Sequence, residues 1–166
     1  METIIGPVWI FGDDIDTDAI VSGLYLDAPI EEAVPHVLEN VRPDFPKGVR
    51  PGDLMVAGRN FGCGSSREQA AEALRSMGIG CIVAESFGRI FFRNAVAVGL
   101  PVLTCPGVSA AFGEQHTAVI DLARAGVENR QTGETMTGHP LSPEMIRIIS
   151  AGGVLALLQN QKEGYK

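Results

Sequence analysis

Two serines, an arginine and a glutamate follow a pair of glycines near the middle of the chain, in the stretch GCGSSRE. Gly62 and Gly64 allow the backbone to turn sharply and let a ligand approach without a Cβ in the way. Ser65 with Glu68 three residues later is a capping-box pattern, which predicts Ser65 as the N-cap of a helix. The free N–H groups of such a helix start, beside Arg67, predict an anion site.

A carboxylate suits this loop better than a phosphate does. The loop lacks the Gly-Lys-Ser/Thr of a Walker motif, and its glycines do not have the G-x-G-x-x-G spacing of a dinucleotide site. N–H donors, a helix N-terminus and Arg67 all favour a deprotonated serine, which could remove a proton next to a carboxylate. The structural alternative is that Ser65 only caps a helix and the glycines only form a turn.

The elements on either side of this loop are predicted to form the parallel part of a sheet. Apolar runs predict short buried strands at residues 54–57, 79–84 and 100–104, with helices between them at residues 65–77 and 86–98. Alternation of strand and helix implies parallel pairing with right-handed crossovers. The loop then lies between the first of these strands and its helix.

The second of these helices is predicted to begin at Ser86, as its cap, and to carry an apolar stripe. Arg89, Arg93 and Asn94 are its polar members. They either form a solvated face or serve in the site or in a subunit contact. We do not assign them to the catalytic set.

The rest of the chain is predicted to complete one α/β domain over residues 1–166, with a β-rich extension that covers the core. Its elements are a first strand at residues 4–11, a short helix within 29–40, strands at 117–122, 126–129 and 134–137, a helix from Ser142-Pro143 to Gly152, and a final turn or two at 154–161.

Composition places the chain among ordinary globular proteins. It has 166 residues, 45% hydrophobic and 20% charged, and its net charge of −7 argues against nucleic-acid binding. The three cysteines, Cys63, Cys81 and Cys105, are widely spaced and contain no C-x-x-C pair, so neither a disulfide framework nor a metal site is predicted. With no signal-peptide pattern and no long apolar run, a cytoplasmic location is expected.

An acidic turn follows the first strand, with four aspartates among residues 13–18. An EF-hand loop would need glycine at its sixth position and glutamate at its twelfth, where this chain has Asp18 and Leu24. We therefore expect Asp13, Asp14 and Asp16 to be structural or solvated rather than ligands of calcium.

Five motifs, in this order, resemble the swivel domain of the aconitase superfamily, and in particular the separate small subunits of 3-isopropylmalate dehydratase (isopropylmalate isomerase) and homoaconitase. The resemblance implies a single swivelling β/β/α domain of the aconitase C-terminal type. The motifs are FGDDIDTD at residues 11–18, VRPDF at 41–45, RPGD at 50–53, GRNFGCGSSRE at 58–68 and ESFGRIF at 85–91.

The resemblance also implies a reaction. Members of this superfamily dehydrate and rehydrate a hydroxy acid, and a [4Fe–4S] cluster with one open iron acts as the Lewis acid. In two-chain members the cluster is on the large subunit, so this chain would bind no metal and would be active only with that partner. The implied reaction interconverts 2-isopropylmalate and 3-isopropylmalate in leucine biosynthesis. The alternatives are a homoaconitase, a dehydratase of methyl-substituted malates, and, from another class, a non-catalytic anion-binding module.

By motif match, Ser65 is the base and Asp18 lies beside it as the second catalytic residue. The substrate-binding residues implied in the same way are Ser66, Arg67, Thr17, Gly64, Tyr25 and Leu26.

The loop after Tyr25 and Leu26 chooses among substrate side groups in these relatives. An arginine at the next position accompanies recognition of the additional carboxylate by homoaconitase, whereas this chain has Asp27 there, followed by Ala28. Since Asp27 would repel a carboxylate, the resemblance favours an alkyl-substituted malate.

Overall fold

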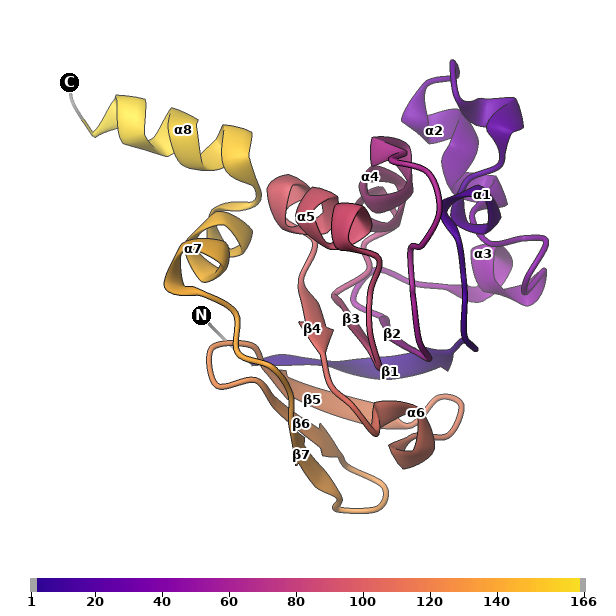
Figure 1. Ribbon diagram of the computed structural model, residues 1–166, viewed down its shortest axis with the longest axis vertical. Helices are drawn as coiled ribbons and strands as arrows, with labels where there is room; N and C mark the ends of the chain where they lie inside the picture. The colour runs from indigo at the N-terminus through magenta and orange to yellow at the C-terminus, as the bar shows by residue number, and fades with distance from the viewer. Residues whose placement is uncertain (1–2, 165–166) are drawn as a thin grey trace.

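The computed structural model describes residues 3–164. Its centre is a seven-stranded sheet with the order β4-β3-β2-β1-β5-β6-β7, and most of the helices lie above it in the view of Figure 1. The strands are β1 (Ile4–Ile10), β2 (Leu54–Ala57), β3 (Cys81–Ala84), β4 (Val102–Thr104), β5 (Thr117–Asp121), β6 (Gly126–Asn129) and β7 (Thr135–Thr137). The helices are α1 (Thr17–Ile20), α2 (Ile30–Ala33), α3 (Asp44–Gly48), α4 (Glu68–Ser76), α5 (Arg89–Val98), α6 (Val108–Ala111), α7 (Pro143–Ala151) and α8 (Val154–Glu163), with 3-10 turns η1 (Gly23–Tyr25) and η2 (Val34–His36).

The parallel part of the sheet consists of β1 to β4, and α4 and α5 form two of its crossovers. Every residue of β2 and β3 is buried. Strands buried on both faces have continuous apolar sequences rather than alternating ones, which is why these strands could be identified from their composition. The predicted strand-helix-strand core is thus confirmed.

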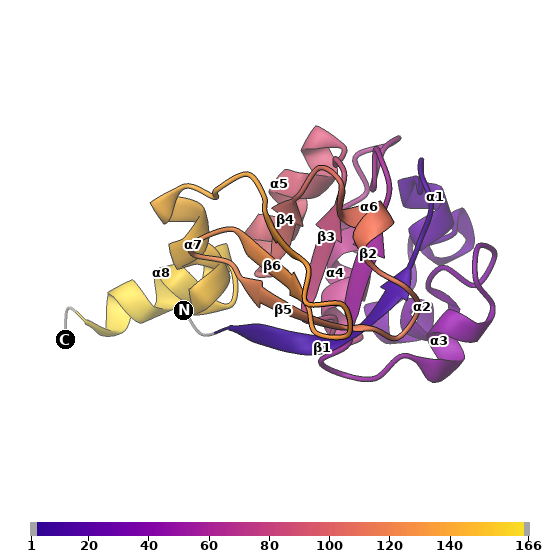
Figure 2. The same ribbon diagram turned by 90° about the horizontal axis from the view of Figure 1, so that it is seen from below.

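β1 belongs to both halves of the sheet. Its first residues, from Ile4 to Pro7, pair antiparallel with β5, whereas Val8 to Ile10 pair parallel with β2. Figure 2 shows β1 along the base of the molecule, with β5 and β6 toward one of its ends and β2 and β3 toward the other. The predicted β-rich extension is therefore an antiparallel continuation of the same sheet, from β5 to β7.

The helices pack on the sheet through short apolar stripes. In α4 the buried residues are Ala70, Ala71, Ala73 and Leu74, and the three alanines let the helix lie close to α5. α7 packs beside α5, and α8 extends from the body of the molecule (Figure 1). Within residues 3–164 no helix has the length and apolar character needed to cross a membrane.

Two predicted helix starts are wrong. α4 begins at Glu68 rather than Ser65, and its N-cap is Arg67, with no side-chain cap. The hydroxyl and carbonyl oxygens of Ser65 instead contact the Thr17 hydroxyl, each at 3.1 Å, and the helix starts three residues later. Similarly, α5 begins after Gly88, and the hydroxyl of Ser86 accepts a hydrogen bond from the Asn60 N–H at 2.9 Å.

The other helices differ less from prediction. The helix within residues 29–40 ends at Ala33 and continues as the turn η2, because Pro35 has no N–H to continue an α-helical ladder. Ser142 is the N-cap of α7, as predicted, and its hydroxyl accepts from the Met145 N–H at 3.2 Å. α8 is ten residues long, more than the turn or two expected.

Candidate active site

The loops that follow β1, β2 and β3 are hydrogen-bonded to one another at the carboxyl edge of the sheet. The Gly62 N–H donates to the carbonyl of Ile15 at 2.7 Å, and the Thr17 N–H donates to the carbonyl of Cys63 at 2.9 Å. The Phe61 N–H donates to the carbonyl of Ser86 at 3.1 Å. The carboxyl ends of parallel strands are where ligands bind in open α/β sheets, so the predicted loop lies in the expected place for a site.

Glycine is required where this loop touches α5. Gly62 has φ +79°, and a Cβ there would lie 2.2 Å from Cγ of Phe91. Gly64 has φ +100°, also in the region that favours glycine. The loop therefore follows a path that another residue could not adopt, and this path places Ser65 at the surface.

Thr17 holds Ser65. Its side chain is buried, with 2% exposure, and its hydroxyl lies 3.1 Å from the Ser65 hydroxyl and 3.1 Å from the Ser65 carbonyl. A hydroxyl has one proton to donate. If that proton goes to the carbonyl, the Ser65 hydroxyl donates to Thr17, and the two residues form a short chain of hydrogen bonds.

Asp18 lies against Arg67 in this structure. Its Oδ1 is 2.5 Å from Nη1 of Arg67, and the same nitrogen donates to the carbonyl of Val21 at 3.1 Å. A guanidinium has five N–H donors in a fixed plane. Within residues 3–164 the hydrogen bond and ion pair of the Arg67 guanidinium both use Nη1, which leaves Nε and Nη2 as unpaired donors.

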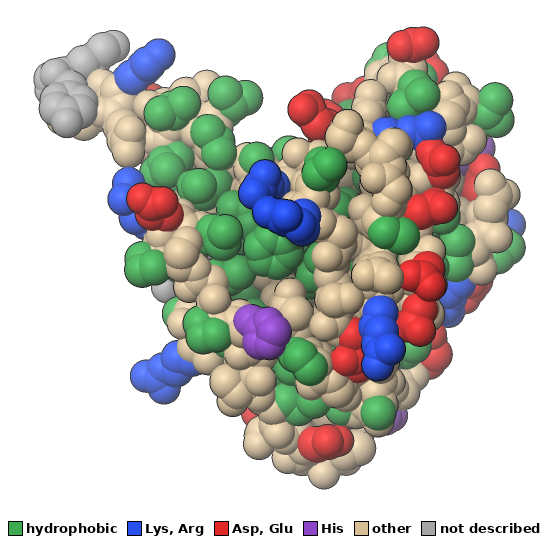
Figure 3. All heavy atoms as spheres, in the orientation of Figure 1, with side chains coloured by type: hydrophobic (Ala, Val, Ile, Leu, Met, Phe, Trp, Pro, Cys, Tyr) green, Lys and Arg blue, Asp and Glu red, His purple; other side chains and the backbone are tan. Residues whose placement is uncertain are grey.

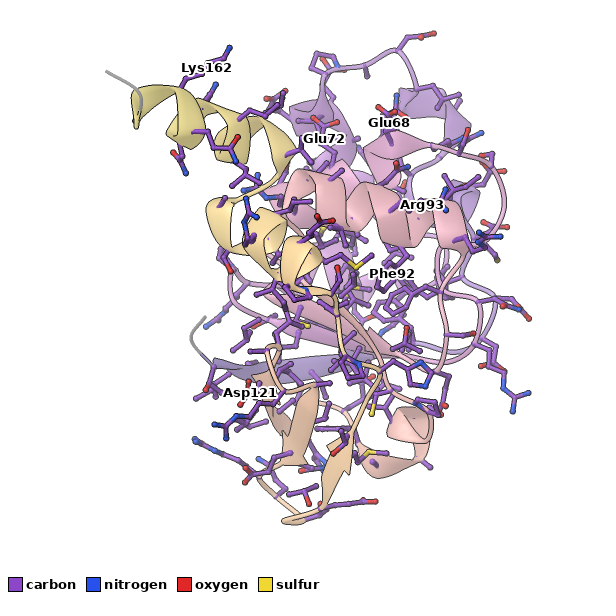
Figure 4. The ribbon with its side chains drawn as sticks, turned by 60° about the vertical axis from the view of Figure 1, so that its left-hand side comes forward. Glu68, Glu72, Phe92, Arg93, Asp121 and Lys162 are labelled. Carbon is purple, nitrogen blue, oxygen red and sulfur yellow. The ribbon has the colours of Figure 1, made fainter. Side chains whose placement is uncertain are left out.

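An open pocket of about 470 Å³ adjoins these residues. Ser65, Ser66, Arg67 and Leu26 line it, together with residues of the first turns of α4. The Gln69 side chain donates to the carbonyl of Leu26 at 3.1 Å, which ties the loop after β1 to α4. Figure 4 shows the two acidic side chains of the lining, Glu68 and Glu72, on α4.

The other residues expected to select the substrate side group, Tyr25, Asp27 and Ala28, do not line this pocket. The Tyr25 ring stacks on the His36 ring, with 4.8 Å between centroids and 13° between planes, and it does not line the pocket at Ser65. Asp27 is exposed, and Ala28 donates its N–H to the carbonyl of Tyr25 at 3.2 Å. Of the four predicted loop residues, Leu26 is thus the one that the structure brings to Ser65.

The acidic turn is structural, as predicted. Oδ1 of Asp16 accepts from the Ala19 N–H at 2.7 Å and so caps α1. Oδ1 of Asp13 accepts from the Arg59 N–H at 2.7 Å, which joins the loops that follow β1 and β2. Sequence reasoning missed Gln69 and the Val21 carbonyl, and a backbone carbonyl gives no signal in a sequence.

The cysteines do not form a metal site. Within residues 3–164 there is no group of three or more His, Cys, Asp or Glu side chains that could hold a metal ion. Burial raises the pKa of the Cys81 thiol to about 12, and burial with the charges of Asp14 and Asp16 raises the pKa of Cys63. The thiolate is the form that binds iron. Burial thus favours the protonated thiol form of Cys63 and Cys81.

Comparison with known proteins gives full-length relatives. The aconitase C-terminal domain family matches residues 32–106. The 3-isopropylmalate dehydratase small subunit 1 of Methanopyrus kandleri is 48% identical over 96% of this chain and 95% of its own length. The methanogen homoaconitase small subunit of Methanothermobacter thermautotrophicus is 47% identical over 93% and 91%. A crystal structure of 3-isopropylmalate dehydratase from Methanocaldococcus jannaschii matches with a TM-score of 0.90 and 38% identity, covering 97% of this chain and 96% of that one.

Fold and comparisons together define a protein of the aconitase C-terminal domain type. The chain belongs to the family of 3-isopropylmalate dehydratase small subunits, whose parent enzymes are hydro-lyases. The α/β fold class expected from the sequence is confirmed by the same comparisons.

Proposed function

We propose that this chain is the small subunit of a hydro-lyase that interconverts 2-isopropylmalate and 3-isopropylmalate in leucine biosynthesis. The observation that carries the proposal is the exposed Ser65, held by the buried Thr17 hydroxyl at 3.1 Å and followed directly by Ser66 and Arg67 at one pocket. The full-length similarity to small subunits of this dehydratase supports it.

In the proposed reaction Ser65 removes the proton from the carbon next to a substrate carboxylate. Arg67 and Ser66 bind that carboxylate through Nε, Nη2 and the hydroxyl. Asp18 acts by holding Nη1 of Arg67, and so fixes the plane of the guanidinium. Arg67, a cation that lines the same pocket, favours the charged form of Ser65, while Thr17 sets the direction of its hydroxyl. Gly64 supports the site through its φ of +100°, which directs the backbone past Asp16 and Thr17 to Ser65.

The partner is a large aconitase-type subunit with a [4Fe–4S] cluster. When bound, that cluster supplies a Lewis acid for the hydroxyl group that leaves. This chain acts as one swivelling domain over residues 1–166, and it brings the base and the carboxylate-binding groups to the partner. Its three cysteines are free, which suits the reducing cytoplasm in which we place the assembly.

The substrate side group is proposed from the loop after β1. Leu26 lines the pocket at Ser65, and an apolar side chain there suits an isopropyl group. The exposed Asp27 disfavours the additional carboxylate of a homoaconitase substrate. The relatives include a homoaconitase small subunit and an isopropylmalate/citramalate isomerase small subunit, so homoaconitase activity and activity on methyl-substituted malates are the alternatives.

The test is purification of the tagged chain from its own cells without oxygen, followed by assays with 3-isopropylmalate, homocitrate and methyl-substituted malates. We expect an iron–sulfur protein to co-purify and the complex to act on 3-isopropylmalate. Turnover of another acid alone would keep the mechanism and change the substrate. A colourless chain that purifies alone and still binds carboxylates would contradict the proposal and indicate a non-catalytic anion-binding module.

A further inference from the structure

We propose that the amino-terminal half of α5 is a docking surface for the large subunit, and that Arg89 and Arg93 bind acidic side chains of that subunit. This inference rests on the proposed function, since it assigns a place on this chain to the proposed partner.

Arg89 and Arg93 form a ridge between two hollows. On one side is an open hollow of about 480 Å³ whose floor is the glycine loop Gly62–Gly64, directly before Ser65. On the other side is an apolar hollow of about 400 Å³ lined by Phe87, Phe92 and Met145 among others. Both arginines line both hollows. The glycine hollow is lined up to Gly64, directly before Ser65, so this surface adjoins the candidate active site.

The two arginines of this ridge form no ion pair with the described residues of the chain. Arg89 and Arg93 are both exposed, and neither has a side-chain hydrogen bond or ion pair with another residue of the described range 3–164. Figure 3 shows Lys and Arg side chains gathered over α5, with hydrophobic side chains around them. In a chain with a net charge of −7, such a local positive ridge favours an acidic partner.

The composition of the surface favours a protein over a small anion. Ile90, between the two arginines, is 48% exposed, and the apolar hollow offers aromatic rings to an inserted side chain. Figure 4 shows Phe92 and Arg93 on α5, with Phe92 below the helix in that view. Arginine and aromatic side chains next to each other are typical of the residues that dominate binding at protein interfaces.

The position of this surface next to Ser65 indicates that the large subunit binds it. A partner that brings its reacting group to Ser65 has to cover the loop before it, and the glycine hollow is formed by that loop. The large subunit would then lie over the ridge as well. Its acidic side chains would pair with Arg89 and Arg93, and an apolar side chain would enter the hollow at Phe92 and Met145.

The experiment measures binding of the cluster-loaded large subunit of the same organism to the full chain, at two salt concentrations. The test variant is the double substitution Arg89→Glu/Arg93→Glu. The matched control is Arg124→Glu/Arg130→Glu, with the same change of charge at exposed positions on the antiparallel extension. A glutamate near the start of a helix is favourable, so the test variant is expected to fold, and its thermal melting checks this.

We expect the dissociation constant of the test variant to rise at least about tenfold, with a weaker dependence on salt, and that of the control to change less than about twofold. The variant Arg89→Lys/Arg93→Lys, which keeps the charge, should bind more tightly than the glutamate variant. With saturating large subunit, the glutamate variant should show the wild-type KM for 3-isopropylmalate.

Equal binding by the glutamate variant and the control would overturn the inference while leaving the proposed function intact. Wild-type binding with a raised KM would also overturn it, because the arginines would then serve the substrate. If the wild-type chain does not bind the large subunit, the inference and the proposed function fail together.

Discussion

The side chains of Ser65 and Thr17 are connected by a hydrogen bond between two neutral hydroxyl groups, not by an ion pair. Thr17 is buried, and a buried hydroxyl without a partner costs free energy, so the contact with Ser65 serves stability as well as position. Ser65 itself is exposed. The arrangement keeps one end of the pair rigid and leaves the other end available to a substrate.

Thr17→Val tests this pair, because it keeps the shape of the side chain and removes the hydroxyl. Loss of the hydrogen bond to the Ser65 hydroxyl, about 1 kcal/mol, should lower kcat of the assembled enzyme roughly fivefold to tenfold. Loss of this bond and of the bond to the Ser65 carbonyl should destabilise the chain by about 1–2 kcal/mol. The measurements are steady-state kinetics and urea unfolding. Thr17→Ser is the control, since it keeps the hydroxyl and should retain most of kcat. An unchanged kcat in Thr17→Val would contradict the positioning role.

At the scale of elements, the close approach of the glycine loop to α5 fixes the site. Gly62 touches the Phe91 side chain, and Phe91 in turn packs against Phe61, with 5.3 Å between ring centroids. The Phe91 side chain of the helix thus packs against two neighbouring residues of the loop, Phe61 and Gly62. A side chain at residue 62 would separate them.

Gly62→Ala should destabilise the chain by about 2–4 kcal/mol, because overpacking adds to the strain of a positive φ. Gly133→Ala is the matched control. Its φ of +77° is almost the same as the +79° of Gly62, but nothing lies within 4 Å of its added Cβ. The control should lose only about 1–2 kcal/mol. Equal losses in urea unfolding of the two variants would show that the contact with Phe91 contributes nothing.

The start of helix α6 is stabilised by the carboxylate of Glu85. Glu85, directly after β3, accepts hydrogen bonds from the Gly107 N–H at 2.6 Å and from the Ser109 N–H and hydroxyl at 3.0 and 2.6 Å, and so caps α6. Desolvation raises the pKa of Glu85, but the hydrogen bonds from Ser109 and Gly107 outweigh it and hold that pKa below its ordinary value of 4.5.

Glu85→Gln should therefore cost about 1 kcal/mol at neutral pH, as for other lost caps. A carboxyl whose folded pKa is lowered stabilises fully above its ordinary pKa, and the stabilisation is lost as the pH falls through the folded value. The difference in unfolding free energy between wild type and Glu85→Gln should thus shrink below pH 4.5. A difference that stays constant from pH 7 to pH 3 would contradict the cap.

The sequence was informative for local features and uninformative for contacts between distant residues. The strand Leu54–Ala57 was predicted with its exact bounds because burial on both faces leaves a continuous apolar run. Ser65 was predicted to cap α4, but Thr17, 48 residues earlier, takes its hydroxyl. The ion pair of Asp18 with Arg67 follows from the same meeting of loops, which no local pattern encodes.

For the whole molecule, β1 connects the two halves of the sheet and places the acidic turn beside the glycine loop. The resulting site is open on one side. The proposed base Ser65 and the proposed carboxylate-binding residues Ser66 and Arg67 line that open side, and the described residues contain no group of His, Cys, Asp or Glu side chains that could hold a metal ion. Under the proposed function the chain alone is expected to be inactive, and turnover should rise to saturation as the large subunit is added.

The most direct measurement compares turnover of 3-isopropylmalate by the large subunit assembled with the wild-type chain and with the Ser65→Ala chain. We predict that both assemble with equal affinity, and that Ser65→Ala lowers kcat by about 10²–10⁴, as expected for a general base. Ser66→Ala, in the same loop, should mainly raise KM. Normal turnover with Ser65→Ala in the assembled complex would contradict the assignment of Ser65 as the base.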